Sequence, residues 1–356
     1  MPRLYDQTAY FERGGASKKQ RRFNQQESTH MSFSLIRRSL AVAALVWVSS
    51  ALLFAASEGN FDRSLKVTGA VDMDLSTGAG RVTVKTGPAG TVTIHGHVQA
   101  NESWFRGEGA EERVERIIKN PPIEQNGNVI HIGRLDDPEL RRNISISYDV
   151  VVPAETRLVS KTGSGDQTID GIHGPLEFST GSGALKATNI GAEVRASAGS
   201  GDVTLEAVNG SVHATTGSGR ISALRISGGF DGGTGSGDVR VQQAGEGNVK
   251  VSTGSGRVGV EGVKGGLSVG TGSGDIDVQG QPTAGWKVET GSGQVRVQLP
   301  SNAAFDLYAR SSSGRIEVNH PVTMEGALGR HEVRGKVRGG GYLLELRSAS
   351  GDITVR

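Results

Sequence analysis

A Gly-Ser-Gly tripeptide recurs through the middle of the chain and constrains its fold more than any other feature. Its eight copies begin at Gly163, Gly181, Gly199, Gly217, Gly235, Gly254, Gly272 and Gly291. Successive copies are 18 or 19 residues apart. Such a fixed period predicts a solenoid, in which each repeat buries its apolar face only by stacking on its neighbours.

Apolar and polar residues alternate after each tripeptide. In the third repeat, Val203 and Leu205 flank Thr204. The same two positions hold Gln167 and Ile169, Leu185 and Ala187, Ile221 and Ala223, Val239 and Val241, Val258 and Val260, Ile276 and Val278, and Val295 and Val297. This alternation is typical of a strand with one buried face. Similar pairs, such as Val249 and Val251, precede each tripeptide, so each repeat is predicted to hold two strands.

The residue before the tripeptide is a threonine in every copy but one, where it is Ala198. This threonine column consists of Thr162, Thr180, Thr216, Thr234, Thr253, Thr271 and Thr290. When coils stack, we expect these hydroxyls to satisfy one another at a corner of the solenoid. We expect the glycines to permit that corner, because a positive φ costs glycine little.

The residue after the tripeptide alternates in charge. The alternation is clearest in Asp202, Arg220, Asp238, Arg257 and Asp275. If one repeat forms one coil, neighbours in this column lie about 4.8 Å apart, and the five residues form a structural charge ladder. If a coil instead held two repeats, about 37 residues, aspartate would stack on aspartate and repel it. The alternation therefore favours coils of about 18 residues.

The composition excludes several classes of protein. A chain of 356 residues without cysteine has no disulfides and no cysteine-based zinc or iron–sulfur site. Residues 1–57 contain eight of the 39 Lys and Arg residues and three of the 37 Asp and Glu residues, so the remainder is nearly balanced in charge. Nothing in that balance favours nucleic acid as a partner. We predict an all-β fold, a parallel β-solenoid, over residues 58–356.

Two segments precede the predicted solenoid. Residues 1–38 are polar and basic, and we expect them to be disordered. Residues 39–57 contain an apolar run that is either a transmembrane anchor or the core of a cleaved signal peptide. In both cases the solenoid is exported, and Arg37 and Arg38 keep the preceding side in the cytoplasm. Met31 is an alternative start, since it would give a shorter leader typical of a signal peptide.

Both ends of the predicted solenoid depart from the repeat. Residues 100–142 form an insertion in which Val114, Ile117 and Ile118 fall on one helical face, so we expect a short helix that covers the first coil. Strands at 129–132 and 144–152 should then return to the solenoid.

Near the carboxyl end, degenerate corners recur at Gly314 and Gly351, 37 residues apart. That spacing predicts one unmarked coil between them and a solenoid that ends on the strand at 352–356.

The repeats resemble the bacterial putative-adhesin domain family, a DUF4097-like domain of unknown function. The resemblance rests on the Gly-Ser-Gly-Asp repeats, the segment YDVVVPAETRLVSKTGSGD, the segment QVRVQLPSNAAFDLYARSSSGRIEV and the ending SASGDITVR, and it covers residues 61–356. It implies a β-solenoid of the cell envelope, commonly behind one membrane segment. It supplies no catalytic residues.

Three kinds of chemistry are alternatives to a purely structural role. A calcium-binding β-roll needs an acidic residue at each turn, whereas Arg220 and Arg257 occupy alternate positions here. Asp170 and Glu206 lie two coils apart, about 9.6 Å, a spacing compatible with an inverting glycosidase but also with ordinary surface acids. His95 and His97 share one strand face without a visible third metal ligand. We therefore predict no enzyme activity, no cofactor and no metal site.

The sequence favours a rigid binding or adhesion surface at the cell envelope. Envelope glycans or other envelope proteins would be its partners, with the membrane a further contact if residues 39–57 stay uncleaved. The alternative is an envelope-stress sensor, or another regulatory membrane protein, whose basic amino-terminal segment contacts a cytoplasmic partner. Deleting residues 1–30 separates the two hypotheses, because a surface module should function without them.

Overall fold

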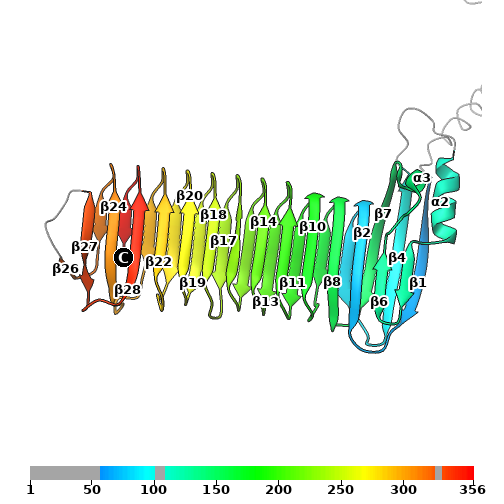
Figure 1. The fold of residues 1–356 in the computed structure, drawn as a ribbon, viewed down its shortest axis with the longest axis horizontal. Helices are drawn as coiled ribbons and strands as arrows, with labels where there is room; N and C mark the ends of the chain where they lie inside the picture. The colour runs from blue at the N-terminus through cyan, green and yellow to red at the C-terminus, as the bar shows by residue number, and fades with distance from the viewer. Residues whose placement is uncertain (1–56, 101–108, 325–330) are drawn as a thin grey trace, which may run out of the picture. The chain divides into compact units, whose positions relative to one another are not determined.

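The computed structural model describes residues 57–100, 109–324 and 331–356 (Figure 1). The basic segment expected at residues 1–38 and, apart from Ser57, the apolar segment expected at residues 39–57 lie outside this range. Among the described residues, no helix is long and apolar enough to cross a membrane.

The strands of the described residues form two sheets around one core. Sheet A has 14 strands, in the order β1 (Glu58–Lys66), β4 (Thr91–Ala100), β7 (Ile144–Val152), β3 (Val82–Thr86), β9 (Gln167–Asp170), β11 (Leu185–Ile190), β13 (Val203–Val208), β15 (Ile221–Ile226), β17 (Val239–Gln243), β19 (Val258–Val263), β21 (Ile276–Gly280), β23 (Val295–Gln298), β29 (Ile353–Val355) and β25 (Ile316–Val318). Sheet B has 15 strands, in the order β26 (Val322–Met324), β27 (Glu332–Val337), β24 (Phe305–Ser311), β28 (Tyr342–Ser348), β22 (Trp286–Thr290), β20 (Leu267–Thr271), β18 (Val249–Thr253), β16 (Phe230–Thr234), β14 (Val212–Thr216), β12 (Val194–Ala198), β10 (Leu176–Ser182), β8 (Thr156–Ser164), β2 (Val71–Ala79), β6 (Val129–Ile132) and β5 (Ile123–Asn126).

Each repeat forms one coil, with one strand in each sheet. In sheet A, Leu185 pairs in parallel with Val203, 18 residues later. In sheet B, Val194 pairs in parallel with Val212. The parallel β-solenoid and the coil of about 18 residues are confirmed, and a coil of two repeats is excluded, because consecutive repeats are hydrogen-bonded to each other.

The alternation in the sequence separates the core from the surface. Val203 and Leu205 are fully buried, while Thr204 between them faces outward. Burying one such side chain contributes about 1.5 to 3 kcal/mol, and every coil adds more of them. The large core residue Trp286 is also buried, and its indole N–H donates to the Gly265 carbonyl oxygen at 2.8 Å, so its one polar group is satisfied.

The first coil in the chain is not the first coil of the stack. β2 and β3 lie between the coil of β6 and β7 and the coil of β8 and β9. Val82 of β3 pairs in parallel with Tyr148 on one side and with Gln167 on the other. Beyond β7, β4 and β1 extend sheet A in antiparallel pairing. The strands expected at 129–132 and 144–152 are present, but they form the coil outside β2 and β3.

The helix within the insertion is α2 (Ala110–Lys119), which packs against β1 and β4 (Figure 1). Val114 and Ile117 are its buried residues, on the face that the sequence indicated. Lys119 forms an ion pair with Glu115 at 2.7 Å, one turn earlier, whereas Arg116 contacts Asp137 at 3.2 Å. Asp137 in turn caps the short helix α3 (Pro138–Arg141).

The last coil in the chain is also out of sequence order. β28 and β29 lie between the coil of β22 and β23 and the coil of β24 and β25 (Figure 1). Ile353 of β29 pairs with Val295 on one side and with Ile316 on the other. The expectation of an unmarked coil between Gly314 and Gly351 is therefore wrong, since their coils are direct neighbours. The intervening chain forms β26 and β27, which extend sheet B in antiparallel pairing. β29 is an interior strand rather than the end of the solenoid.

Engineered cysteines can test this order, because the chain has none of its own. Arg296 and Thr354 are paired residues on β23 and β29, whereas β29 separates Arg296 from Glu317. Adjacent strands are about 4.8 Å apart, within the reach of a disulfide. We expect Arg296→Cys with Thr354→Cys to form an intramolecular disulfide on oxidation, detected by peptide mass, and Arg296→Cys with Glu317→Cys to remain reduced. The opposite pattern would mean that the coils stack in chain order.

Candidate functional site

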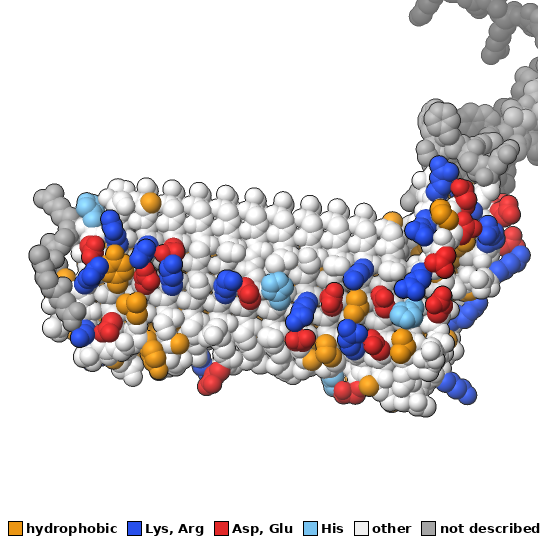
Figure 2. All heavy atoms as spheres, viewed as in Figure 1, with side chains coloured by type: hydrophobic (Ala, Val, Ile, Leu, Met, Phe, Trp, Pro, Cys, Tyr) orange, Lys and Arg blue, Asp and Glu red, His pale blue; other side chains and the backbone are white. Residues whose placement is uncertain are grey.

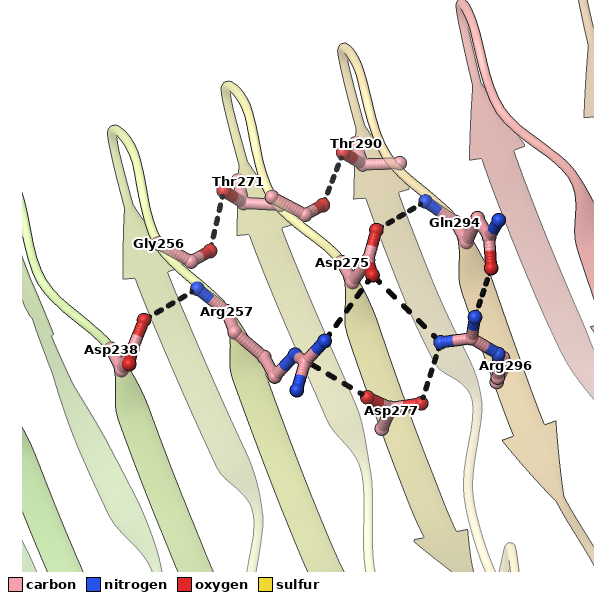
Figure 3. Close-up of polar contacts among 10 residues, drawn as sticks. Asp238, Gly256, Arg257, Thr271, Asp275, Asp277, Thr290, Gln294 and Arg296 are labelled. Atoms are coloured by element: carbon pink, nitrogen blue, oxygen red, sulfur yellow. Dashed lines mark hydrogen bonds and ion pairs between the residues drawn. The ribbon is translucent and has the colours of Figure 1, made fainter.

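The residues that directly follow the glycine corners form a column, and every second coil places an aspartate in it. These aspartates bind the backbone of the adjacent coil. In stack order the column reads Arg81, Asp166, Ala184, Asp202, Arg220, Asp238, Arg257, Asp275, Gln294, Asp352 and Arg315. Each aspartate accepts, through Oδ1, a hydrogen bond from the backbone N–H of the next residue in the column, at 2.8 or 2.9 Å. Figure 3 shows the contacts of Asp238 and Asp275. The alternation is regular only in stack order, because chain order puts Arg315 before Asp352.

Ion pairs within the predicted charge ladder are few. Its residues Asp202, Arg220, Asp238, Arg257 and Asp275 stack in one column, as described above. Among them, only Arg257 and Asp275 bring their charged groups within 4 Å, at 3.5 Å, and all five lie within the described part of the chain. An exposed pair of this kind contributes little to stability. The aspartates therefore act mainly on the backbone of the adjacent coil.

The threonine column also bonds to the backbone rather than to itself. Thr234 is buried and donates its hydroxyl to the Gly219 carbonyl oxygen of the preceding coil at 2.9 Å. The same bond, at 2.8 to 3.3 Å, is made by Thr180, Thr216, Thr253, Thr271 and Thr290. Figure 3 shows Thr271 and Thr290. The expectation that the hydroxyls satisfy one another is wrong. The buried hydroxyl of Thr162 has no hydrogen-bond partner among the described residues.

Close contact between coils explains the glycines of the corner. A Cβ on Gly219 would lie 1.9 Å from the Gly201 carbonyl oxygen, closer than real Cβ atoms come to any atom. Among the tripeptide glycines, all of which are described, only Gly165 and Gly183 have positive φ, 153° and 155°. The expectation that positive φ explains these glycines is therefore wrong for most coils. A side chain is excluded because the backbone of the neighbouring coil occupies its place.

The carboxylates considered for glycoside cleavage are both engaged in surface contacts. Asp170 and Glu206 lie in one column with Thr188 between them. Asp170 accepts hydrogen bonds from the Thr188 hydroxyl at 2.7 Å and from Asn189 at 2.9 Å, and the Thr188 bond is the main reason why its pKa is lowered. Glu206 pairs with Arg225 at 2.7 Å. Because a glycosidase needs one of its carboxyls protonated, these contacts do not support that role.

The two histidines considered for metal binding contact the neighbouring strand instead. His95 Nδ1 lies 2.8 Å from Asp62 Oδ1, and His97 Nδ1 lies 2.7 Å from Asn60 Oδ1. Both contacts cross from β4 to β1. In the described ranges, no three metal-ligating side chains come together as an ion would require.

A polar groove on the outer face of sheet A is the feature that the sequence analysis missed. Two hollows, of about 280 and 360 Å³, adjoin at Gln279 and Gln298. We call them together the sheet A groove and define it by Glu261, Asp277, Gln279, Arg296, Gln298 and Pro300. It forms because Gly259 takes an outward position next to Asp277, and a Cβ on Gly259 would meet nothing within 4 Å. The sequence feature that marks this groove is Gly259, the single glycine in an outward-facing column of larger residues.

Three charged groups of the sheet A groove are paired, whereas Lys264 and Arg356, which also line the two hollows, are exposed and form no ion pair within the described ranges. Arg296 contacts Asp277 at 3.3 Å, and Arg240 contacts Glu261 at 3.1 Å. Figure 3 shows Arg296 between Asp275, Asp277 and Gln294. The amides of Gln279 and Gln298 are exposed and make no hydrogen bond within the described part of the chain. The groove thus offers free amide donors and acceptors beside paired charges, with two unpaired cations in its lining.

The outer face of sheet B is different in character. Charged side chains of both signs form a row across it (Figure 2). A shallow hollow of about 710 Å³ lies over β12, β14, β16 and β18, beside Arg195, His213, Asp231 and Lys250. Its charges are exposed and alternate in sign, so this face is a solvated one with no concentration of either charge.

Removing one aspartate of the corner column should weaken one junction between coils. We expect Asp238→Ala to leave the Arg257 N–H without its partner and to cost about 1 kcal/mol locally. Amide exchange at Arg257 should then be about fivefold faster in a hydrogen-exchange measurement. Asp231→Ala is the control, since its exposed contact with Lys250 at 3.9 Å should contribute nothing measurable. Equal effects of the two variants would contradict this role of the column.

The Thr188 hydrogen bond should set the acid response of Asp170. A carboxyl whose folded pKa is lowered stabilises the fold above its unfolded value, about 3.9, and this contribution is lost as the pH falls through the folded pKa. We expect Thr188→Val to raise the pKa of Asp170 toward its usual range, measured by NMR titration, and to remove that contribution. Thr204→Val, on the same face, should leave the titration of Asp170 unchanged. An unchanged pKa in Thr188→Val would assign the shift to another cause.

Comparisons with known proteins give one match to a family model and several distant structural likenesses, two of which are as follows. A putative cell adhesion protein from Clostridium sporogenes is 11% identical, with a TM-score of 0.18 over 84% of this chain and 98% of that one. A putative adhesin from Bacteroides fragilis is 12% identical, with a TM-score of 0.29 over 84% of this chain and 97% of that one. With TM-scores this low, neither likeness bears on function. No curated protein matches the sequence.

The sequence match lies in the carboxyl-terminal part of the chain. The family model described as Toastrack DUF4097 matches residues 227–356, which include the out-of-order last coil. The coils before residue 227 continue the same corner in the same register. The resemblance seen in the sequence is thus confirmed, since residues 227–356 match the Toastrack DUF4097 family model.

Proposed function

We propose that this solenoid is a non-enzymatic binding surface of the cell envelope, and that the sheet A groove binds an extended, hydroxyl-rich polymer such as an envelope glycan. The observation that carries the proposal is the pair of adjoining hollows around the unpartnered amides of Gln279 and Gln298. Gln279 and Gln298 are paired residues, so a polymer laid along β21 and β23 would meet both side chains at the same level.

The groove stands on a rigid support. Val258, Ile276 and Val295 are fully buried beneath it, and each belongs to a continuous parallel ladder. The backbone that carries the outward side chains is therefore already ordered before a ligand arrives. Binding then costs less conformational entropy than binding by a loop would.

The chemistry of the groove favours a polymer rich in hydroxyl groups. Arg296, Asp277 and Glu261 have ion-pair partners at 3.1 and 3.3 Å, so a ligand would have to compete for them. Lys264 and Arg356 are unpaired cations in the same lining, so an acidic group on the polymer would also be accepted. The free amides offer both donors and acceptors, which match sugar hydroxyls.

Removing the two amides should show whether the polymer binds at this groove or elsewhere on the surface. We expect Gln279→Ala with Gln298→Ala to weaken binding of the full chain to isolated envelope polysaccharide at least about tenfold, or about 1.4 kcal/mol, by co-sedimentation. Gly259→Tyr, which fills the groove without a clash at Cβ, should act in the same way. Thr204→Ala with Ser222→Ala is the matched control on the same face and should bind as the wild type does.

Three outcomes would contradict the proposal. If the wild-type chain sediments with no envelope polymer, the binding function fails. If the control pair weakens binding as much as the glutamine pair, the site is not the groove. If the polymer is shortened during incubation, the chain is an enzyme. A chelator in parallel samples should change nothing, since we expect no metal to take part.

A further inference from the structure

A second pocket lies where one corner of the solenoid is replaced by a loop. Between β6 and β7 the chain runs through residues 133–143 and α3 instead of through a tight glycine corner. Figure 1 shows where α3 lies. A pocket of about 340 Å³ is lined by residues of this loop and by Arg141 of α3. We call it the corner pocket and define it by Ser76, Thr77, Gly78, Gly133, Arg134 and Tyr148.

The floor of the corner pocket carries a buried hydroxyl without a partner. Tyr148 is 1% exposed, and its Oη makes no hydrogen bond with any described residue. That oxygen lies 3.4 Å from the point where a Cβ on Gly133 would be, at the wall of the pocket. A buried hydroxyl without a partner costs about 1 to 3 kcal/mol. Burial also raises the pKa of Tyr148, so the phenol keeps its proton and remains a donor.

The rim of the corner pocket carries a free guanidinium group. Arg134 is exposed and makes no ion pair or hydrogen bond within the described ranges. Arg141, the second arginine at the pocket, donates to the carbonyl oxygens of Leu135 and Asp136 at 2.6 and 3.3 Å and holds the loop in place. The carboxylate of Asp136 also lines the pocket and opposes an anion. The lining of the corner pocket therefore contains two arginines and one aspartate, and its net charge is positive.

These groups together form a small donor-rich site. We propose that the corner pocket binds a small oxyanion, a carboxylate or a phosphate group, between the guanidinium of Arg134 and the hydroxyl of Tyr148. The oxyanion accepts a charge-assisted hydrogen bond from Arg134 at the rim and a hydrogen bond from the Tyr148 O–H at the floor. Ser76 is the further hydroxyl in the lining, whereas Thr77 already donates to the carbonyl oxygens of Ala79 and Ile146.

Glycine keeps the pocket open at one wall. Gly78 lines it, and a Cβ there would meet nothing within 4 Å. The φ of Gly78 is not positive, so a larger residue can take this backbone conformation. Gly78→Leu would therefore fill the pocket while leaving the strands intact. The site does not depend on the sheet A groove, and its test uses other ligands and other variants.

The test is calorimetric titration of the full chain with glucuronate and, separately, with inorganic phosphate. We expect binding of at least one of them, weakened about tenfold or more by Tyr148→Phe and by Arg134→Gln and abolished by Gly78→Leu. Arg220→Gln is the control, since Arg220 is also exposed and makes no side-chain contact within the described residues. Binding of glucuronate alone assigns the site to carboxylates, and binding of phosphate alone assigns it to phosphates.

The stability of Tyr148→Phe distinguishes a ligand site from a structural one. Removing a buried hydroxyl that has no protein partner should leave Tm unchanged or raise it, while ligand binding falls. Failure of the wild-type chain to bind either probe at millimolar concentration would overturn the proposal. Binding that is unchanged in Tyr148→Phe and Gly78→Leu would also overturn it, because the anion would then lie elsewhere.

Discussion

Backbone-to-backbone contact at the glycine corners is the constraint on which the rest of this solenoid depends. The first and third glycines of each tripeptide lie against carbonyl oxygens of the coil before, and no side chain fits between them. That contact brings six of the seven threonine hydroxyls, all but that of Thr162, and each aspartate carboxylate of the column within hydrogen-bonding reach of the adjacent coil. The polar groups of the corner are then satisfied by the backbone, as buried or tightly packed polar groups must be. Repetition of one small corner therefore orders both sheets.

Much of the fold followed from the sequence because its signals are periodic. The pairs Val203 with Leu205 and Val249 with Val251 indicated two strands per coil and their buried faces, and both are buried. The order of the coils at the two ends was missed for a physical reason. The inward residues Ile316 and Ile353 would pack equally well beside Val295, so hydrophobic patterning cannot choose between them. The clue was electrostatic, since the aspartates alternate only when Asp352 precedes Arg315 in the stack.

The candidate sites were harder to predict than the fold. The sequence located the threonine column, but the hydrogen-bond partners of its hydroxyls depend on how far one coil is displaced from the next. Both proposed binding sites occur where the repeat is broken, at Gly259 for the sheet A groove and at residues 133–143 for the corner pocket. A break in a pattern marks a position without saying what shape results. The path of the loop over Tyr148 has no periodic signal at all.

The position of the last coil has a consequence for the way in which the chain assembles. A solenoid ordinarily grows by adding each repeat to the one before. Residues 161–298 can follow this course during synthesis, because each coil finds its neighbour already in place. Residues 305–318 cannot, since the coil that they stack on is formed by residues 342–355, which emerge later. The last step is therefore the placement of the coil of β28 and β29 between two coils that precede it in the chain. Until it is complete, the apolar faces of β24 and β25 lack their neighbour, and this is the stage at which the chain is most open to incorrect pairing.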